Sequence, residues 1–336
     1  MNYKTAYGFL INKYDAKDIK FLGAGSDSFA FKVHDQVYRF PKTNKNIYQK
    51  EADVCRVIKK DISVEIPEIE IHQEGDVSYA VHKMLMGGNW SWHKFSFKPR
   101  KQQKLAKSCA KFLAQLHSVD VPALVKAVPE LKQNVPYMKF KDVEQYFIPY
   151  LSPRHMKAFK KNYEKIINQK IAGKDMVLVH FGLKGPNSVV NPDGSLRGVF
   201  DFCNCGIYER SRDLVTLALS KNKPLYRTFL SEYKKLSGAK VSRKRIMDLA
   251  KIEFLWAKRW LREGKIHPLG DRFLKSNITN ALAHFYGVPK FMRWWLALRI
   301  SMHEFLYLEK QRAAQEKQSD MIKIEPPVST VGTKQV

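Results

Sequence analysis

The chain has 336 residues, of which 44% are hydrophobic and 12% aromatic, so global disorder is excluded and one large domain or two lobes can form. Lys and Arg number 59 against 32 Asp and Glu, which gives a formal charge of +27. That charge favours phosphates, nucleic acid or anionic membranes as partners and disfavours polycationic ligands. A general enrichment in lysine gives the same charge without any function, and the sequence leaves both interpretations open.

Cysteine use and apolar runs bear on the cellular setting. Four unevenly spread cysteines are too few for a disulfide framework, and Cys203 and Cys205 have no nearby partners for a zinc site. Residues 1–18 lack the apolar core and cleavage site of a secretory signal, and no run of about 18 apolar residues predicts a membrane span. We therefore expect a soluble, cytoplasmic protein.

Residues 1–86 predict a small β-rich lobe. A hairpin is expected over 19–40, where "IKFLGAGSDSFAFKV" alternates around a glycine-rich turn, "HD" makes a tight turn and "QVYRF" forms the second strand. Helical periodicity follows over 46–60. Two further strands are expected at 64–75 and 77–85.

The remainder is predicted to be mainly helical. A hinge and linker at 87–100 leads to a helical lobe at 101–317, which contains one β-island at 175–202 with an "NPDG" hairpin turn. Residues 318–336 are rich in Pro, Ser and Thr, and we expect them to be disordered. The pattern therefore predicts an α+β fold with a small antiparallel N-terminal lobe and a larger helical lobe.

The glycine-rich turn has features of a phosphate site. Phosphoryl transfer needs backbone N–H groups around the phosphates, a cation, oxygen ligands for a metal ion, and a carboxylate that orients the attacking hydroxyl. Gly23 and Gly25 allow the backbone to approach a phosphate, and Ser26 and Ser28 add hydroxyls. A purely structural turn is the alternative.

Charged and amide side chains supply further parts. Arg39 and Lys42 follow as candidate cations, and Glu51 lies early on the next helix, where it can hold one of them. Asn187 offers an amide oxygen and Asp201, at the end of an apolar strand, offers a carboxylate, and Mg²⁺ accepts both. A turn or capping role for Asp201 remains open.

The ordered series of motifs resembles a known family. The segments "LGAGSDSFAFKV", "VYRFPK", "YQKEADVCRVI", "CAKFLAQLHSV", "LVHFGLKGPNSVV" and "GVFDFCNCGIYERSRDLVTL" are similar to those of the aminoglycoside phosphotransferase and choline kinase family. They are closest in pattern to the subgroup that modifies the 2″-hydroxyl of aminoglycosides. The resemblance covers about residues 15–310 and implies a bilobal protein-kinase-like fold.

The resemblance implies ATP or GTP and Mg²⁺ as cofactors and a small-molecule hydroxyl as phosphate acceptor. The Gly23–Gly25 turn with Ser28 would cover the phosphates, and the hinge backbone from Lys83 through Leu85 to Met86 would bind adenine. The remaining implied roles are Mg²⁺ binding by Asn187 and Asp201, an architectural His180, a phosphate contact by Lys184, and bracing of the loop by Asp213.

The departures from the family pattern concern the catalytic step. Gly182 stands where the family has its catalytic Asp, Phe181 precedes it, Arg39 replaces a Lys, and Cys203 replaces a Gly. Because an orienting carboxylate typically supplies about 10²- to 10⁴-fold, we expect phosphoryl transfer to be impaired or absent. The alternative is a pseudokinase scaffold that binds an acidic partner through its basic surface. No dedicated nucleic-acid motif is present.

Overall fold

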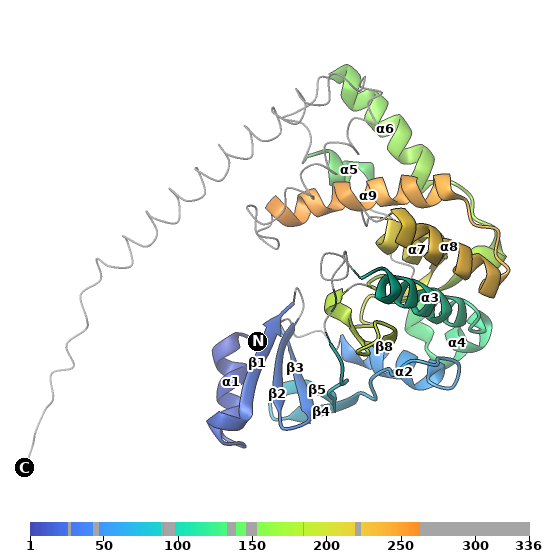
Figure 1. Cartoon of the computed structure of the whole chain (residues 1–336). Helices are drawn as coiled ribbons and strands as arrows, with labels where there is room; N and C mark the ends of the chain where they lie inside the picture. The colour runs from blue at the N-terminus through green and yellow to red at the C-terminus, as the bar shows by residue number, and fades with distance from the viewer. Residues whose placement is uncertain are drawn as a thin grey trace, which may run out of the picture. The chain divides into compact units, whose positions relative to one another are not determined.

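The structure is a computed structural model of the whole chain (Figure 1). It describes residues 1–25, 28–42, 47–88, 90, 98–132, 139–145, 153–183, 185–218 and 223–262. Ser26, Lys184 and the predicted tail at 318–336 lie outside the described residues. Two compact units form, Met1–Met138 with Ile166–Glu253 and Lys139–Lys165 with Phe254–Val336.

A five-stranded antiparallel sheet opens the first unit. Its strands lie in the order β1-β2-β3-β5-β4, with bounds β1 Ile19–Ala24, β2 Ser28–Val33, β3 Gln36–Pro41, β4 Glu70–Glu74 and β5 Val77–Lys83. The expected hairpin over 19–40 is confirmed and contains a third strand, because the glycine-rich turn separates β1 from β2.

The strand expected over 64–75 begins only at Glu70, so the prediction was wrong for its first half. Glu65 instead pairs with the distant segment around Gly198. Its N–H donates to the Arg197 carbonyl and its carbonyl accepts from the Val199 N–H, each at 2.9 Å. The backbone groups of this segment are therefore satisfied away from the five-stranded sheet.

Helix α1, Tyr3–Ile11, covers one face of the sheet and was not predicted (Figure 1). Asn2 caps it by accepting from the Thr5 N–H at 2.9 Å. Ala6 and Leu10 are fully buried against an aromatic cluster of the sheet that includes Phe31, Phe40 and Tyr79. This packing fixes one face of the sheet and leaves Arg39, one residue from Phe40 on β3, on the opposite face.

Helix α2, Tyr48–Ile58, follows β3 and confirms the helix predicted over 46–60. After β5 the chain passes through a glycine pair that joins the sheet to the β-island. Gly88 exchanges two backbone hydrogen bonds with Val190, at 2.9 and 3.0 Å. Gly87 has φ of 149°, and a Cβ there would lie 2.9 Å from the Val189 Cβ. Close approach of the two segments therefore requires glycine at 87.

The first unit also contains two short sheets and further helices. Besides α1 and α2, its helices are α3 Pro99–Leu116, α4 Val121–Ala127, α7 Ser211–Ala218, α8 Lys223–Ser237 and the start of α9 Arg243–Arg262. One sheet pairs β6 Met176–Val179 with β9 Gly206–Glu209, and the other pairs β7 Ser188–Val190 with β8 Leu196–Val199. The predicted β-island and its "NPDG" turn are confirmed, and Gly194 in that turn has φ of 93°.

The second unit contains α5 Phe140–Glu144, most of α6 Pro153–Ile167 and the end of α9. Phe140 packs against Phe159 and Tyr163 with ring centroids 5.1 and 5.8 Å apart.

The four cysteines of the chain are all free. None of the described helices combines the length and the apolar character that a bilayer crossing requires.

Candidate functional site

The loop after β6 is built around a buried histidine. His180 is fully buried, and its ring packs edge-on against Phe202 with centroids 4.4 Å apart. Its Nε2 lies 3.2 Å from the Phe200 carbonyl, and its Nδ1 accepts the Gly182 N–H at 3.1 Å. Burial lowers the pKa of His180, so the ring is neutral and can accept at Nδ1. The imidazole therefore fixes the path of the loop.

Asp213 on α7 holds the same loop through its backbone. The N–H groups of His180 and Phe181 donate to the two carboxylate oxygens at 2.8 and 2.7 Å. Phe181 has φ of 64°, a left-handed conformation that is uncommon for an aromatic residue and that these bonds support. Burial alone would raise the pKa of Asp213, but hydrogen bonds from His117 and from the His180 backbone hold that pKa below its usual range.

Two residues that support Asp213 were missed from the sequence. His117 Nε2 lies 3.2 Å from an Asp213 oxygen, and His117 Nδ1 lies 2.7 Å from the Tyr233 hydroxyl. Arg210 in turn donates to that hydroxyl at 3.2 Å. His117 and Arg210 lie 116 and 23 residues from Tyr233 in the sequence. They gave no local signal, because the network forms only when α3 packs on α8.

Gly182 stands at the position where the family resemblance implies a catalytic carboxylate. Its φ is outside the left-handed region, so the backbone accepts a residue with a side chain. A Cβ added there would lie 2.9 Å from Asn187 Nδ2. The same Nδ2 donates to the Gly182 carbonyl at 3.0 Å. The Asn187 amide thus lies beside the position at which a carboxylate side chain would begin.

The β7–β8 hairpin brings Asn187 and Asp201 to the same end of the ladder. Ser188 pairs with Val199, and one step beyond, the Phe200 N–H donates to the Asn187 carbonyl at 3.0 Å. Because Nδ2 of Asn187 faces Gly182, its Oδ1 is the atom left to accept. The Asp201 side chain is 38% exposed, and the backbone of Asp201 has φ of 69°. An amide oxygen and a carboxylate are ligand types that Mg²⁺ accepts, and Mg²⁺ binding by this pair stays a prediction.

The expected ion pair between β3 and α2 involves Arg39 and not Lys42. Arg39 Nη1 lies 2.7 Å from Glu51 Oε2, and Glu51 is fully buried. The guanidinium also lies 4.8 Å from the centre of the Tyr48 ring. Burial alone would lower the pKa of Arg39, but the Glu51 carboxylate raises it above its ordinary value. Arg39 therefore carries a fixed positive charge at the edge of the site.

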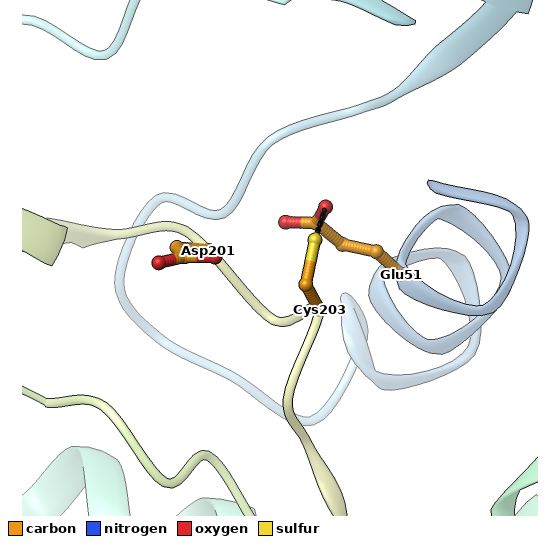
Figure 2. A group of neighbouring side chains, drawn as sticks. All are labelled: Glu51, Asp201 and Cys203. Atoms are coloured by element: carbon orange, nitrogen blue, oxygen red, sulfur yellow. Dashed lines mark hydrogen bonds between the residues drawn. The ribbon is translucent and has the colours of Figure 1, made fainter. Parts of the chain in front are cut away.

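Cys203 completes this ion pair, and Asp201 lies nearby (Figure 2). Its thiol donates to Glu51 Oε2 at 2.8 Å and accepts from Arg39 at 3.3 Å. Among the described residues, the one group with metal-binding atoms within 4.8 Å of one another is Glu51, Asp201 and Cys203. Both Glu51 oxygens are already used, since Oε1 accepts the Phe202 N–H at 2.9 Å. Glu51 is therefore engaged in contacts within the protein, and metal binding by Asp201 stays a prediction.

The glycine-rich turn is closed by its own backbone. The Gly25 N–H donates to the Ser28 carbonyl at 2.9 Å, and the Lys42 amine donates to the Gly25 carbonyl. Gly23 has φ of 153°, and a Cβ there would meet no atom within 4 Å. Lys42 therefore adds a positive charge at the turn itself, while Ser26 lies outside the described residues.

The hinge residues lie beside the β7–β8 hairpin. Leu85 Cδ1 would lie 3.0 Å from a Cβ at Gly198, and the Lys83 carbonyl lies 2.9 Å from His82 Nδ1. Met86 is 61% exposed. Nothing in these contacts tests the expected adenine site, which stays a prediction.

The sequence model of the phosphotransferase enzyme family matches residues 18–241, two thirds of the chain. The chain belongs to this family. The match includes the glycine turn, the Arg39–Glu51 pair, the loop around Gly182 and the hairpin that ends at Asp201.

Solved structures of family enzymes share the fold. The GDP complex of wild-type aminoglycoside 2'-phosphotransferase-IIIa is 17% identical, with a TM-score of 0.62 over 85% of this chain and 97% of that one. ADP-bound aminoglycoside phosphotransferase APH(2'')-Ib is 19% identical, with a TM-score of 0.61 over 85% and 99%. The apoenzyme of macrolide 2'-phosphotransferase MphH from Brachybacterium faecium is 15% identical, with a TM-score of 0.54 over 85% and 98%. The α+β, kinase-like fold expected from the sequence is confirmed.

Proposed function

We propose that the chain binds a purine nucleotide, ATP or GTP, together with Mg²⁺, and that its transfer of phosphate to a small-molecule hydroxyl is strongly impaired. Family membership supports the reaction class. The GDP and ADP complexes among the similar structures support the ligand class. The proposal combines a preserved binding site with a missing catalytic group.

The observation that carries the proposal is the geometry at Gly182. No side chain is available there to orient an attacking hydroxyl, and the Asn187 amide lies 2.9 Å from where the Cβ of such a side chain would be. The loop is nevertheless held in place, because Asp213 accepts hydrogen bonds from the backbone on the N-terminal side of Gly182. A loop that is braced but lacks its carboxylate fits retained binding better than general decay of the site.

Each residue of the proposed site has a separate task. The backbone of the Gly23–Gly25 turn would approach the phosphates, and Lys42 and Arg39 would place positive charge beside them. Asn187 Oδ1 and Asp201 would hold Mg²⁺, which neutralises charge on the phosphate oxygens when bound. Glu51 would act through Arg39, which it holds in place, and not by contacting the nucleotide.

The acceptor is proposed to be neutral or anionic. Phe181, next to Gly182, stacks on the buried Arg212 guanidinium at 4.1 Å, and Tyr208 lies on the same guanidinium at 4.6 Å. The whole chain carries a formal charge of +27. A polycationic acceptor such as an aminoglycoside would be repelled by that charge. We therefore place the acceptor outside the aminoglycosides.

The proposal is tested by measuring binding and turnover on the same preparation. Thermal shift should detect ATP or GTP only with Mg²⁺, and Asp201→Ala should remove the shift. Acceptor-dependent nucleotide turnover should be at background for a panel of hydroxyl compounds. Rapid turnover by the wild-type chain would refute the impairment, and no shift with either nucleotide would refute the binding site.

A second candidate function is a scaffold for an acidic partner. Helix α6 favours it, because exposed cations follow one another along its length: Arg154, Lys157, Lys160, Lys161 and Lys165. Binding of polyglutamate should weaken with salt and with Lys157→Glu/Lys161→Glu. The control variant reverses the charges of Lys234 and Lys235 on α8 and so has the same net charge as the α6 variant. Equal weakening of polyglutamate binding in both variants would argue against α6 as a dedicated surface.

A further inference from the structure

A polar cavity lies at the far end of the β6–β9 sheet from the loop around Gly182. Its volume is about 160 Å³, and it is lined by the segment before β6, the start of α7 and the turn before α9. Met176 pairs with Glu209 at the cavity end and Val179 with Gly206 at the loop end. The two ends are three residue steps apart, roughly 10 Å. The cavity is therefore separate from the proposed nucleotide site.

Two ion pairs form the inner wall of the cavity. Glu209 accepts from Arg245 at 2.9 and 2.5 Å, and both side chains are buried. Asp175 accepts from Arg210 Nε at 3.0 Å. Each carboxylate in the wall is thus neutralised by an arginine, and neither repels an incoming anion strongly.

Three further polar side chains of the wall, those of Lys170, Lys240 and Ser211, can donate to a ligand. Lys170 and Lys240 line the cavity and make no ion pair with any described residue, so four basic and two acidic lining residues leave a net charge of +2. Ser211 is only 7% exposed, and its hydroxyl has no hydrogen-bond partner within the described part of the chain.

Helix geometry adds to the same preference. α7 begins at Ser211, and α9 begins at Arg243, directly after the lining residue Ser242. Helix N-termini carry partial positive charge and free N–H groups, which favour anions. Ser242 caps α9 by accepting the Arg245 N–H at 3.3 Å and keeps its own O–H as a donor, beside that of Ser211.

We propose that this cavity is a binding site for a small oxyanion, a phosphate or carboxylate group, held by Ser211, Lys170 and Lys240. The Glu209–Arg245 and Asp175–Arg210 pairs shape the pocket, and the two lysines at its exposed rim supply the unbalanced charge. About 160 Å³ accommodates such a group together with several water molecules. The site does not depend on the nucleotide site and stands if nucleotide binding fails.

The test is a titration of the full chain with inorganic phosphate, and in parallel with acetate, followed by backbone amide NMR. We expect phosphate-induced shifts at residues 209–213 and 240–242. Ser211→Ala and Lys240→Met should each weaken phosphate by about tenfold, as for loss of a hydrogen bond to a charged group. Acetate binding at the same amides would extend the ligand class to carboxylates, and its failure would restrict the class to phosphates.

The matched control is Lys235→Met, which removes one exposed charge on α8 outside the cavity. It should change the phosphate affinity by less than about twofold, because exposed charges at a distance are screened. Equal weakening by Lys235→Met and Lys240→Met would overturn the proposal. So would shifts confined to the glycine turn, or an unchanged affinity in a folded Ser211→Ala protein.

Discussion

Restoring a carboxylate with Gly182→Asp tests the cause of the proposed impairment. The backbone at 182 accepts an L residue, but the new Cβ would lie 2.9 Å from Asn187 Nδ2, so the Asn187 amide must move. Loss of its 3.0 Å bond to the Gly182 carbonyl costs about 0.5–1.5 kcal/mol, whereas replacing glycine returns about 0.4–1 kcal/mol by restricting the unfolded chain. The variant should therefore fold with nearly wild-type stability.

The assay is acceptor-dependent nucleotide turnover against a panel of neutral and anionic hydroxyl compounds. Gly182→Asp should raise turnover by about 10²- to 10⁴-fold, the range expected for an orienting or general-base group. Gly182→Asn is the control, since it has the same shape without the carboxylate. Equal turnover by the two variants, with nucleotide binding intact in both, would refute the claim that the missing carboxylate limits transfer.

Three further predictions concern polar side chains that are buried or half-buried. Glu209→Ala leaves the Arg245 guanidinium buried without its carboxylate and should lower the free energy of unfolding in urea by about 3–5 kcal/mol, whereas exposed Arg243→Ala should change it by less than about 0.5 kcal/mol. Similar losses of unfolding free energy in both variants would contradict the stabilising role of the Glu209–Arg245 pair. Burial lowers the pKa of His82, while an unfolded histidine titrates near about 6.5, so stability should fall as pH drops below about 6.5. The fall in stability with pH should be shallower in His82→Gln, and an unchanged slope would argue against His82 as its source. Burial raises the pKa of Cys203, so iodoacetamide should alkylate it far more slowly in the native protein than in urea, and equal rates would count against a protonated thiol.

The sequence was sufficient for local features with strong patterns. The hairpin turns, α2 and the β-island follow from glycine placement and from hydrophobic period, which act over a few residues. The sequence narrowed the partner of Glu51 only to Arg39 or Lys42, because the choice depends on which face of β3 each side chain occupies.

Features that depend on long-range packing could not be predicted. Nothing near Glu65 indicates that it pairs with the segment around Gly198, 133 residues away. The position of Asn187 against the Gly182 carbonyl, the support of Asp213 by His117, and the cavity around Ser211 arise likewise from contacts between distant segments. The residue types in these places are common, and only their assembly gives them a chemical role.

The most direct test of the account is a calorimetric titration of the wild-type chain with ATP and with GTP, in the presence and absence of Mg²⁺. The account predicts binding of at least one nucleotide that depends on Mg²⁺ and is lost in Asp201→Asn, while Lys235→Met binds as the wild type does. Binding that is indifferent to both Mg²⁺ and Asp201, or no binding of either nucleotide, would contradict it.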